Sequence, residues 1–152
     1  MIVGRVSSAS YKEMMLSLSQ GNPAIRLVPE FVPDEAIQLY MNACDACVLP
    51  YRNMTTSGAA LLALSFGRPI IAPAIASLPE LITPETGILY DPSQPDALVS
   101  ALQKAKQQSW SEAEIFDYAH QFDWDKLGPQ LAALYQTEAS GQRQTETTSK
   151  RT

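Results

Sequence analysis

The chain has 152 residues, of which 45% are apolar and 18% charged, so one domain with a buried core is expected rather than a disordered chain. Its 11 lysines and arginines stand against 16 aspartates and glutamates. The resulting net charge of −5 argues against a nucleic-acid groove or an anionic membrane surface as partner. With a single histidine and no acidic cluster at metal-ligand spacing, we expect no metal site and no metal cofactor.

Short apolar runs alternate with helical patterns along the chain. The runs that predict strands are residues 2–3, 25–28, 46–49, 69–72 and 86–90. The patterns that predict helices are residues 10–18, 33–43, 58–64, 96–106 and 124–135. Two serines, Ser10 and Ser111, each precede a glutamate by three residues, as in a capping box at a helix start. Together these patterns predict an α/β fold with a Rossmann-like parallel sheet and helices on both faces.

The end of the chain differs from the rest, because from Thr137 onward it has no apolar periodicity. We therefore predict a single domain over residues 1–136 and a disordered tail over residues 137–152. No apolar run reaches the roughly 20 residues that cross a bilayer, and no signal peptide is evident, so a cytoplasmic location is expected. Cys44 and Cys47 follow a predicted helix, at the end whose dipole disfavours a thiolate, so small buried residues are favoured over a redox pair.

The most informative segment is the polar loop of residues 51–57, which follows a predicted strand and precedes a helix that opens on small residues. Parallel sheets bind ligands beyond the carboxyl ends of their strands, where helices begin. The first amides of such a helix carry partial positive charge, Thr56 and Ser57 add hydroxyls, and Arg52 adds a cation. These features predict a phosphate or diphosphate site at Gly58 without a metal. The plainer alternative makes Thr56 or Ser57 a helix cap and Gly58 a packing residue, and local features support both interpretations equally.

Five segments resemble, in order and spacing, the C-terminal half of GT-B glycosyltransferases, specifically the retaining group 1 (family 4) enzymes. The segments are residues 31–37, 39–50, 62–72, 77–82 and 86–89, and the pairs Asp123-Trp124 and Leu134-Tyr135 extend the match. This resemblance implies a domain that binds the nucleotide diphosphate of a sugar donor. It implies that the loop of Glu30, Phe31 and Val32 lies along the base and that the segment of Ser57 and Gly58 holds the diphosphate. It also places Glu80 at the sugar side, although a capping carboxylate is an equally good interpretation of this residue.

The chain departs from the family pattern in two respects. Many members carry two glutamates eight positions apart, and Met54 and Leu62 stand at those positions here. The resemblance therefore places Met54 at the sugar side, where it lacks the carboxylate of those members. Thr56-Ser57-Gly58 is similar to a loop that some members carry instead. The resemblance further implies that an acceptor domain and the first strand of this half are missing. Transferase activity of the chain alone is therefore expected to be negligible, and an N-terminal GT-B half or self-association is expected to complete it.

Two functions from different classes remain at this point. The first is a group 1 glycosyltransferase domain that binds a nucleotide-sugar donor, with no catalytic residue identified. The second is a non-catalytic relative that acts as a nucleotide-binding or assembly module. His120 lies near Phe116 and Phe122 without a nucleophile beside it, and is expected to be a packed or solvent-edge residue.

Overall fold

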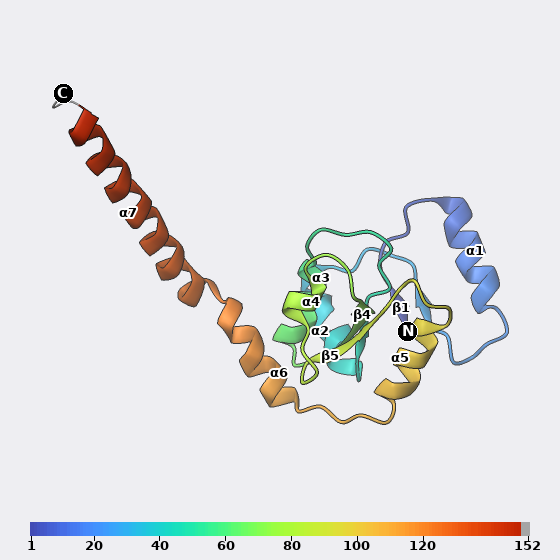
Figure 1. Cartoon of the computed structure of the whole chain (residues 1–152). Helices are drawn as coiled ribbons and strands as arrows, with labels where there is room; N and C mark the ends of the chain where they lie inside the picture. Colours follow the sequence, from blue (N-terminus) through green and yellow to red (C-terminus); the bar gives the residue numbers. More distant parts are fainter. Residues whose placement is uncertain (150–152) are drawn as a thin grey trace. The chain divides into compact units, whose positions relative to one another are not determined.

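The computed structural model describes the backbone of residues 1–149 and the side chains of residues 1–136 (Figure 1). The chain divides into two compact units, Met1–Cys44 and Asp45–Thr152. The single domain expected over residues 1–136 stays a prediction. All the strand pairs of the described residues are parallel, as the alternating sequence pattern predicts.

The first unit contains a two-stranded sheet and two helices. Its elements are β1 (Ile2–Val3), α1 (Ala9–Ser19), β2 (Leu27–Val28) and α2 (Asp34–Ala43). The strands pair with Ile2 opposite Leu27 and Val3 opposite Val28. Every residue of this unit is at least partly exposed. A segment this short rarely builds a core of its own, because its surface is large relative to its volume.

The start of α1 differs from the sequence prediction. The helix cap is Ser8, in extended backbone, and its hydroxyl oxygen accepts a hydrogen bond from the Tyr11 amide at 3.2 Å. Ser10, the predicted cap, lies inside the helix. Both serines precede the same apolar face, so the spacing alone did not separate them.

Replacing Ser8 with alanine is expected to lower the free energy of unfolding by about 1 kcal/mol, because the Tyr11 amide loses its acceptor. Ser10→Ala is the matched control and should change it by about 0.5 kcal/mol at most, because Ser10 is the second residue of the helix and its hydroxyl contacts the Ser8 hydroxyl, at 3.3 Å, rather than capping an amide. Urea unfolding followed by circular dichroism measures both. A larger loss of unfolding free energy for Ser10→Ala than for Ser8→Ala would show that Ser10, as the sequence predicts, caps the helix.

The second unit contains a three-stranded sheet in the order β3-β4-β5. Its strands are β3 (Cys47–Val48), β4 (Ile70–Pro73) and β5 (Gly87–Tyr90). Its helices are α3 (Gly58–Ser65), α4 (Leu78–Leu81), α5 (Ala97–Ala105), α6 (Glu112–Ala119), the 3-10 turn η1 (His120–Phe122) and α7 (Trp124–Ser149). The predicted strands 46–49, 69–72 and 86–90 are thus confirmed, with no end shifted by more than one residue.

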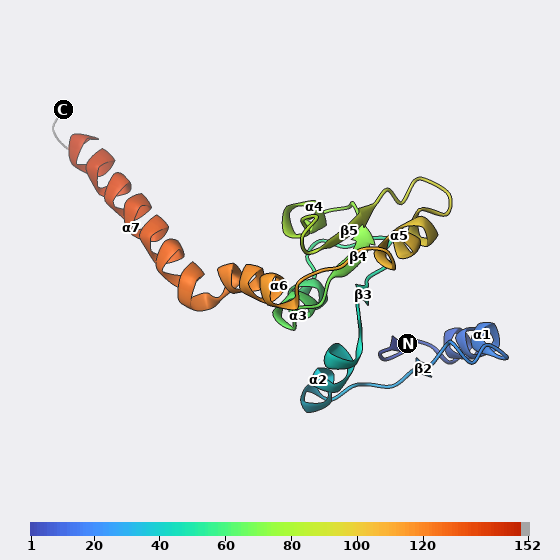
Figure 2. The same ribbon diagram turned by 90° about the horizontal axis from the view of Figure 1, so that it is seen from below.

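The core of the second unit lies on both faces of this sheet, because successive residues of β4 point to opposite sides. α3 lies on one side of β4 and β5, and α5 on the other (Figures 1 and 2). Ile70 and Ala72 pack in one cluster with buried residues of α3, α4 and α6. Ile71 packs in a second cluster with Ile88 of β5 and Ala101 of α5. Helices therefore cover both faces, as expected for a parallel sheet.

The last helices agree with the sequence at their starts and differ at the end of the chain. Ser111 caps α6 by accepting from the Glu114 amide at 3.3 Å, as its spacing predicts. α7 begins at Trp124 and continues to Ser149. The disordered tail expected over residues 137–152 stays a prediction. Residues 150–152 of the expected tail lie outside the described residues.

Candidate functional site

The candidate site is the loop between β3 and α3, at the carboxyl end of β3. The Leu49 amide donates to the Ile71 carbonyl at 2.9 Å, which continues the pairing with β4 by one residue. The Tyr51 amide then donates back to the Leu49 carbonyl at 2.8 Å, so the chain turns away from the sheet. The loop therefore leaves the sheet at the edge where doubly wound folds bind their ligands.

Ser57 is the cap of α3. Its hydroxyl oxygen accepts from the Ala60 amide at 3.1 Å and lies 3.0 Å from the phenol oxygen of Tyr51. The residue is only 9% exposed. The Ala60 and Leu61 amides also donate to the Ser57 carbonyl. The amides of Gly58 and Ala59 have no intrahelical acceptor. The cap and the ligand site are therefore compatible, because the cap leaves two amides of the helix start available.

Gly58 lies in open space. A Cβ built on this residue meets no atom within 4 Å, and its backbone is not in the left-handed region. The alternative in which Gly58 is a packing residue is thus not what the structure shows. Arg52 and Thr56 are exposed on the same loop, so a cation and a hydroxyl accompany the two amides.

Two contacts that the sequence analysis missed hold this loop in place. One is the Tyr51–Ser57 contact described above, and the other joins α4 to the loop: the Ser77 hydroxyl donates to the Thr55 carbonyl at 3.0 Å. Ser77 and Thr55 are 22 positions apart, so no local pattern indicates their contact. The helix start is therefore fixed from two sides.

The remaining residues of the predicted sugar side lie in different environments. Met54 is half-buried and packs against the core of the second unit. Leu62, at the other family glutamate position, is a half-buried residue of α3. Glu80 is exposed in the first turn of α4, where a carboxylate interacts favourably with the helix dipole.

The predicted base-binding residues belong to the first unit. Glu30, Phe31 and Val32 follow β2 and precede α2, the position of a loop at the carboxyl end of a parallel strand. Phe31 exposes 70% of its surface, so its ring is open to a planar partner. Within the described residues, no three His, Cys, Asp or Glu side chains gather closely enough to hold a metal ion.

Gly67 and His120 have contacts that the structure also defines. Gly67 has a φ of +67°, and a Cβ there would lie 2.7 Å from the carbonyl oxygen of Glu112, whose carboxylate pairs with Arg68 at 2.7 Å. Gly67 thus lets α3 and α6 approach. His120 lies 2.5 Å from an Asp123 carboxylate oxygen through Nδ1 and meets the Phe116 ring edge-on with 4.5 Å between ring centroids. Its side chain is 44% exposed, which is the solvent-edge position of the two that were expected.

Comparisons with curated proteins give relatives that transfer sugars. The chain is 30% identical over 104 residues to a GDP-mannose:glycolipid 4-beta-D-mannosyltransferase of Xanthomonas campestris pv. campestris, which covers 66% of this chain and 30% of that protein. It is 30% identical over 109 residues to O-antigen chain mannosyltransferase B of Escherichia coli, and this match covers 69% of this chain and 28% of that protein. A glycogen synthase of Deinococcus deserti is 27% identical over 111 residues, a match that covers 70% of this chain and 25% of that protein. The chain thus spans less than a third of the length of each of these relatives.

The fold is also that of a solved glycosyltransferase. Sucrose-phosphate synthase from Thermosynechococcus elongatus superposes with a TM-score of 0.72 at 22% identity, over 91% of this chain and 37% of that one. No helix among the described residues is long and apolar enough to span a bilayer. The family model described as glycosyl transferases group 1 matches residues 1–108, and the chain therefore belongs to the group 1 glycosyl transferases.

Proposed function

We propose that the start of α3 binds the diphosphate of a nucleotide-sugar donor for glycosyl transfer. The observation that carries the proposal is the open space at Gly58, beside two amides without intrahelical acceptors. A diphosphate oxygen can approach these amides without displacing a side chain, and the partial positive charge of the helix start favours an anion there. Exposed Arg52 and Thr56 supply a further charge and a further donor.

The donor class follows from the family. One relative carries GDP-mannose in its name, and group 1 membership supports a nucleotide sugar here as well. The loop of Glu30, Phe31 and Val32 is proposed to receive the base, and Glu80 to face the sugar. These roles need no metal, because helix amides and Arg52 supply the positive charge that a diphosphate requires.

Isothermal titration of the full chain with GDP, UDP and ADP tests the proposal. Ser57→Asp is expected to abolish binding of the preferred nucleotide, because a carboxylate at the helix start repels the diphosphate. Asp is also a good helix cap, so the variant should fold. Ser65→Asp makes the same change in charge at the other end of α3 and should bind as the natural chain does. No heat with any nucleotide, or equal losses in the two variants, would refute the site.

We further propose that the 152-residue chain binds a donor but transfers sugar at a negligible rate by itself. Transfer requires donor and acceptor to be held together in attack geometry, away from water. The chain spans less than a third of its curated relatives, and an N-terminal GT-B half is the proposed source of the acceptor site. Sugar transfer or donor hydrolysis well above blank, measured with the purified chain, would overturn this proposal.

The second candidate is a non-catalytic nucleotide-binding or assembly module. Met54 and Leu62 favour it, because neither apolar side chain can accept a ribose hydrogen bond or stabilise positive charge, and Met54 packs against the core. Adding the N-terminal half of a group 1 enzyme discriminates the two candidates, since the module would bind nucleotide without gaining transfer. A cytoplasmic location stays a prediction.

A further inference from the structure

Tyr51 is joined to the start of α3 by a pair of hydroxyl groups. Its phenol oxygen lies 3.0 Å from the hydroxyl oxygen of Ser57, six positions further along the chain. The Tyr51 ring packs against the core cluster that contains residues of α3, α4 and α6, and its amide donates to the Leu49 carbonyl at 2.8 Å. Both the ring and the backbone are held, so the phenol oxygen has a defined place beside the helix cap.

The hydrogen bonds of Ser57 determine what its hydroxyl can still do. A serine hydroxyl has one hydrogen and an oxygen with two lone pairs. One lone pair accepts from the Ala60 amide at 3.1 Å. A phenol is a stronger acid than an aliphatic alcohol and is therefore the better donor. The donor of the Tyr51–Ser57 contact is thus expected to be Tyr51, whose hydrogen fills the second lone pair and leaves Ser57 with its own hydrogen to donate.

The hydrogen of Ser57 then lacks an acceptor. Among the described residues, the Ser57 hydroxyl oxygen makes hydrogen bonds with Tyr51 and Ala60 only. Ser57 is 9% exposed, so water has little access to it. A buried donor without an acceptor costs free energy and is rare in folded proteins. The amides of the next two residues, Gly58 and Ala59, also lack an intrahelical acceptor, so three unmatched donors gather at one helix start.

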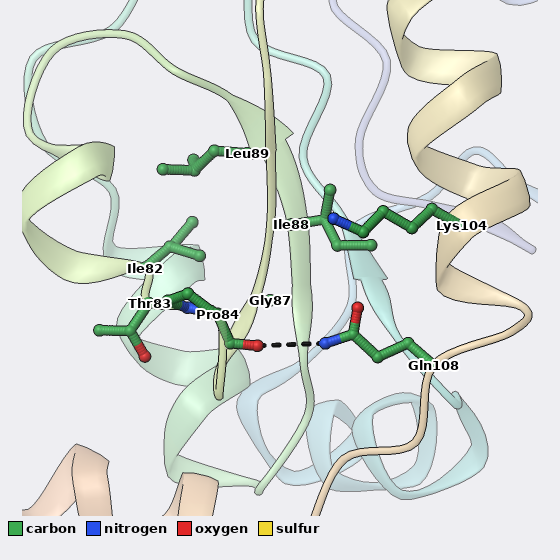
Figure 3. A pocket seen from close by; sticks show the side chains of 8 residues that line it. All are labelled: Ile82, Thr83, Pro84, Gly87, Ile88, Leu89, Lys104 and Gln108. Carbon is green, nitrogen blue, oxygen red and sulfur yellow. Dashed lines mark hydrogen bonds between the residues drawn. The ribbon is translucent and has the colours of Figure 1, made fainter.

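Two side-chain donors near β5 show the usual arrangement. In the hollow beside this strand, the Gln108 side-chain amide donates to the Pro84 carbonyl at 3.2 Å (Figure 3). The indole N–H of Trp110 donates to the same carbonyl at 3.3 Å. Both donors are satisfied within the chain, so neither points to a ligand. The surplus of donors at the start of α3 differs from this arrangement and requires an acceptor from outside the chain.

We infer that Tyr51 is a positioning residue: by filling the second lone pair of Ser57, it directs the Ser57 hydrogen to an oxygen of the bound diphosphate. The inference rests on the proposed donor site and adds to it the residue that orients its hydroxyl. The phosphoryl groups of a nucleotide sugar carry acceptor oxygens and no hydrogen, so they can receive all three donors. Tyr51 acts through Ser57 and makes no contact of its own with the nucleotide.

Titration of the full chain and its variants with the preferred nucleotide among GDP, UDP and ADP tests this role. Tyr51→Phe keeps the ring and is expected to weaken binding about fivefold, because the Ser57 hydroxyl is then free to rotate. Ser57→Ala should weaken binding about tenfold or more, as expected for a lost hydrogen bond to a charged group. The double variant should match Ser57→Ala within about twofold, since Tyr51 acts only through Ser57.

The matched control is Tyr118→Phe. Tyr118 packs against the same core cluster as Tyr51, and its phenol donates to the Leu81 carbonyl at 2.9 Å. The variant therefore removes an equivalent hydroxyl from the same core and should leave the nucleotide affinity within about twofold of that of the natural chain. Urea unfolding of all the variants measures what each substitution costs in stability and shows that each variant folds.

A spectroscopic signature separates the positioning of Ser57 from mere support of the loop. In the natural chain saturated with nucleotide, the Ser57 hydroxyl hydrogen is expected to be visible by NMR and to couple to phosphorus across the hydrogen bond. The signal should be absent from Ser57→Ala, which assigns it. It should also be lost in Tyr51→Phe at saturating nucleotide, because the hydroxyl is no longer directed to the diphosphate.

Two kinds of result overturn the inference. Undiminished affinity in Tyr51→Phe, or an equal loss when this change is made in Ser57→Ala, means that Tyr51 does not act through Ser57. A phosphorus coupling that persists in Tyr51→Phe, or that belongs to the Tyr51 hydrogen, means that Tyr51 does not direct the Ser57 hydroxyl. In these cases the donor site itself stands, because nucleotide still binds. No heat with any nucleotide overturns the donor site and this inference together.

Discussion

Replacing Gly58 with valine is expected to weaken nucleotide binding about 100-fold, which corresponds to roughly 2.7 kcal/mol. The side chain enters space that is empty in the chain by itself, so folding should proceed normally. In the proposed complex the same space holds a diphosphate oxygen against the amides of Gly58 and Ala59. The valine methyl groups would keep that oxygen beyond hydrogen-bond distance. The variant thus separates a loss of binding from a loss of folding.

The control for this prediction is Ser65→Val. Ser65 is an exposed residue at the other end of α3, so the variant places the same side chain on the same helix away from its start. The two variants should have thermal midpoints within a few degrees of the natural chain, and only Gly58→Val should lose affinity for the nucleotide identified by titration. If Gly58→Val binds as tightly as Ser65→Val, the open space at the start of α3 is not where the diphosphate lies.

Much of the fold follows from local patterns. The run Pro69–Ala72 is apolar without alternation, which is what a strand covered on both faces requires, and β4 is such a strand. The parallel arrangement follows because strands alternate with helices. The cap of α1 could not be assigned in this way, since Ser8 and Ser10 differ only in backbone conformation, which the spacing of residues does not determine.

The candidate site was predictable in part, for a related reason. A polar loop before a helix that opens on Ser57 and Gly58 indicates available amides, because every helix start leaves them. From the sequence alone, Gly58 could be a glycine that allows close packing or one that leaves space for a ligand. The difference depends on residues that are distant in the chain. The Ser77–Thr55 contact, 22 positions apart, is of the same kind. Such contacts arise from the tertiary fold, and no periodicity encodes them.

Replacing Gly87 with alanine is expected to have the largest effect on stability, a loss of 3 kcal/mol or more in the free energy of unfolding. A Cβ at Gly87 would overlap the backbone of Ile70, including its carbonyl oxygen. Ile70 lies directly opposite Gly87 in the β4–β5 pair, so neither atom can yield without separating the two strands. Their separation would expose Ile71 and Ile88, which are buried on one face of the sheet.

This loss can be compared with that of a glycine that has room. Gly58→Ala adds the same methyl group in open space at the first position of α3 and should change the free energy of unfolding by about 0.5 kcal/mol at most. Urea unfolding of both variants gives the difference. A cost below about 1 kcal/mol for Gly87→Ala would mean that β5 does not pair with β4 in this register. The proposed donor site depends instead on the neighbouring β3–β4 pair, since the loop that carries Ser57 leaves from β3 and is tied by Ser77 to the segment that follows β4.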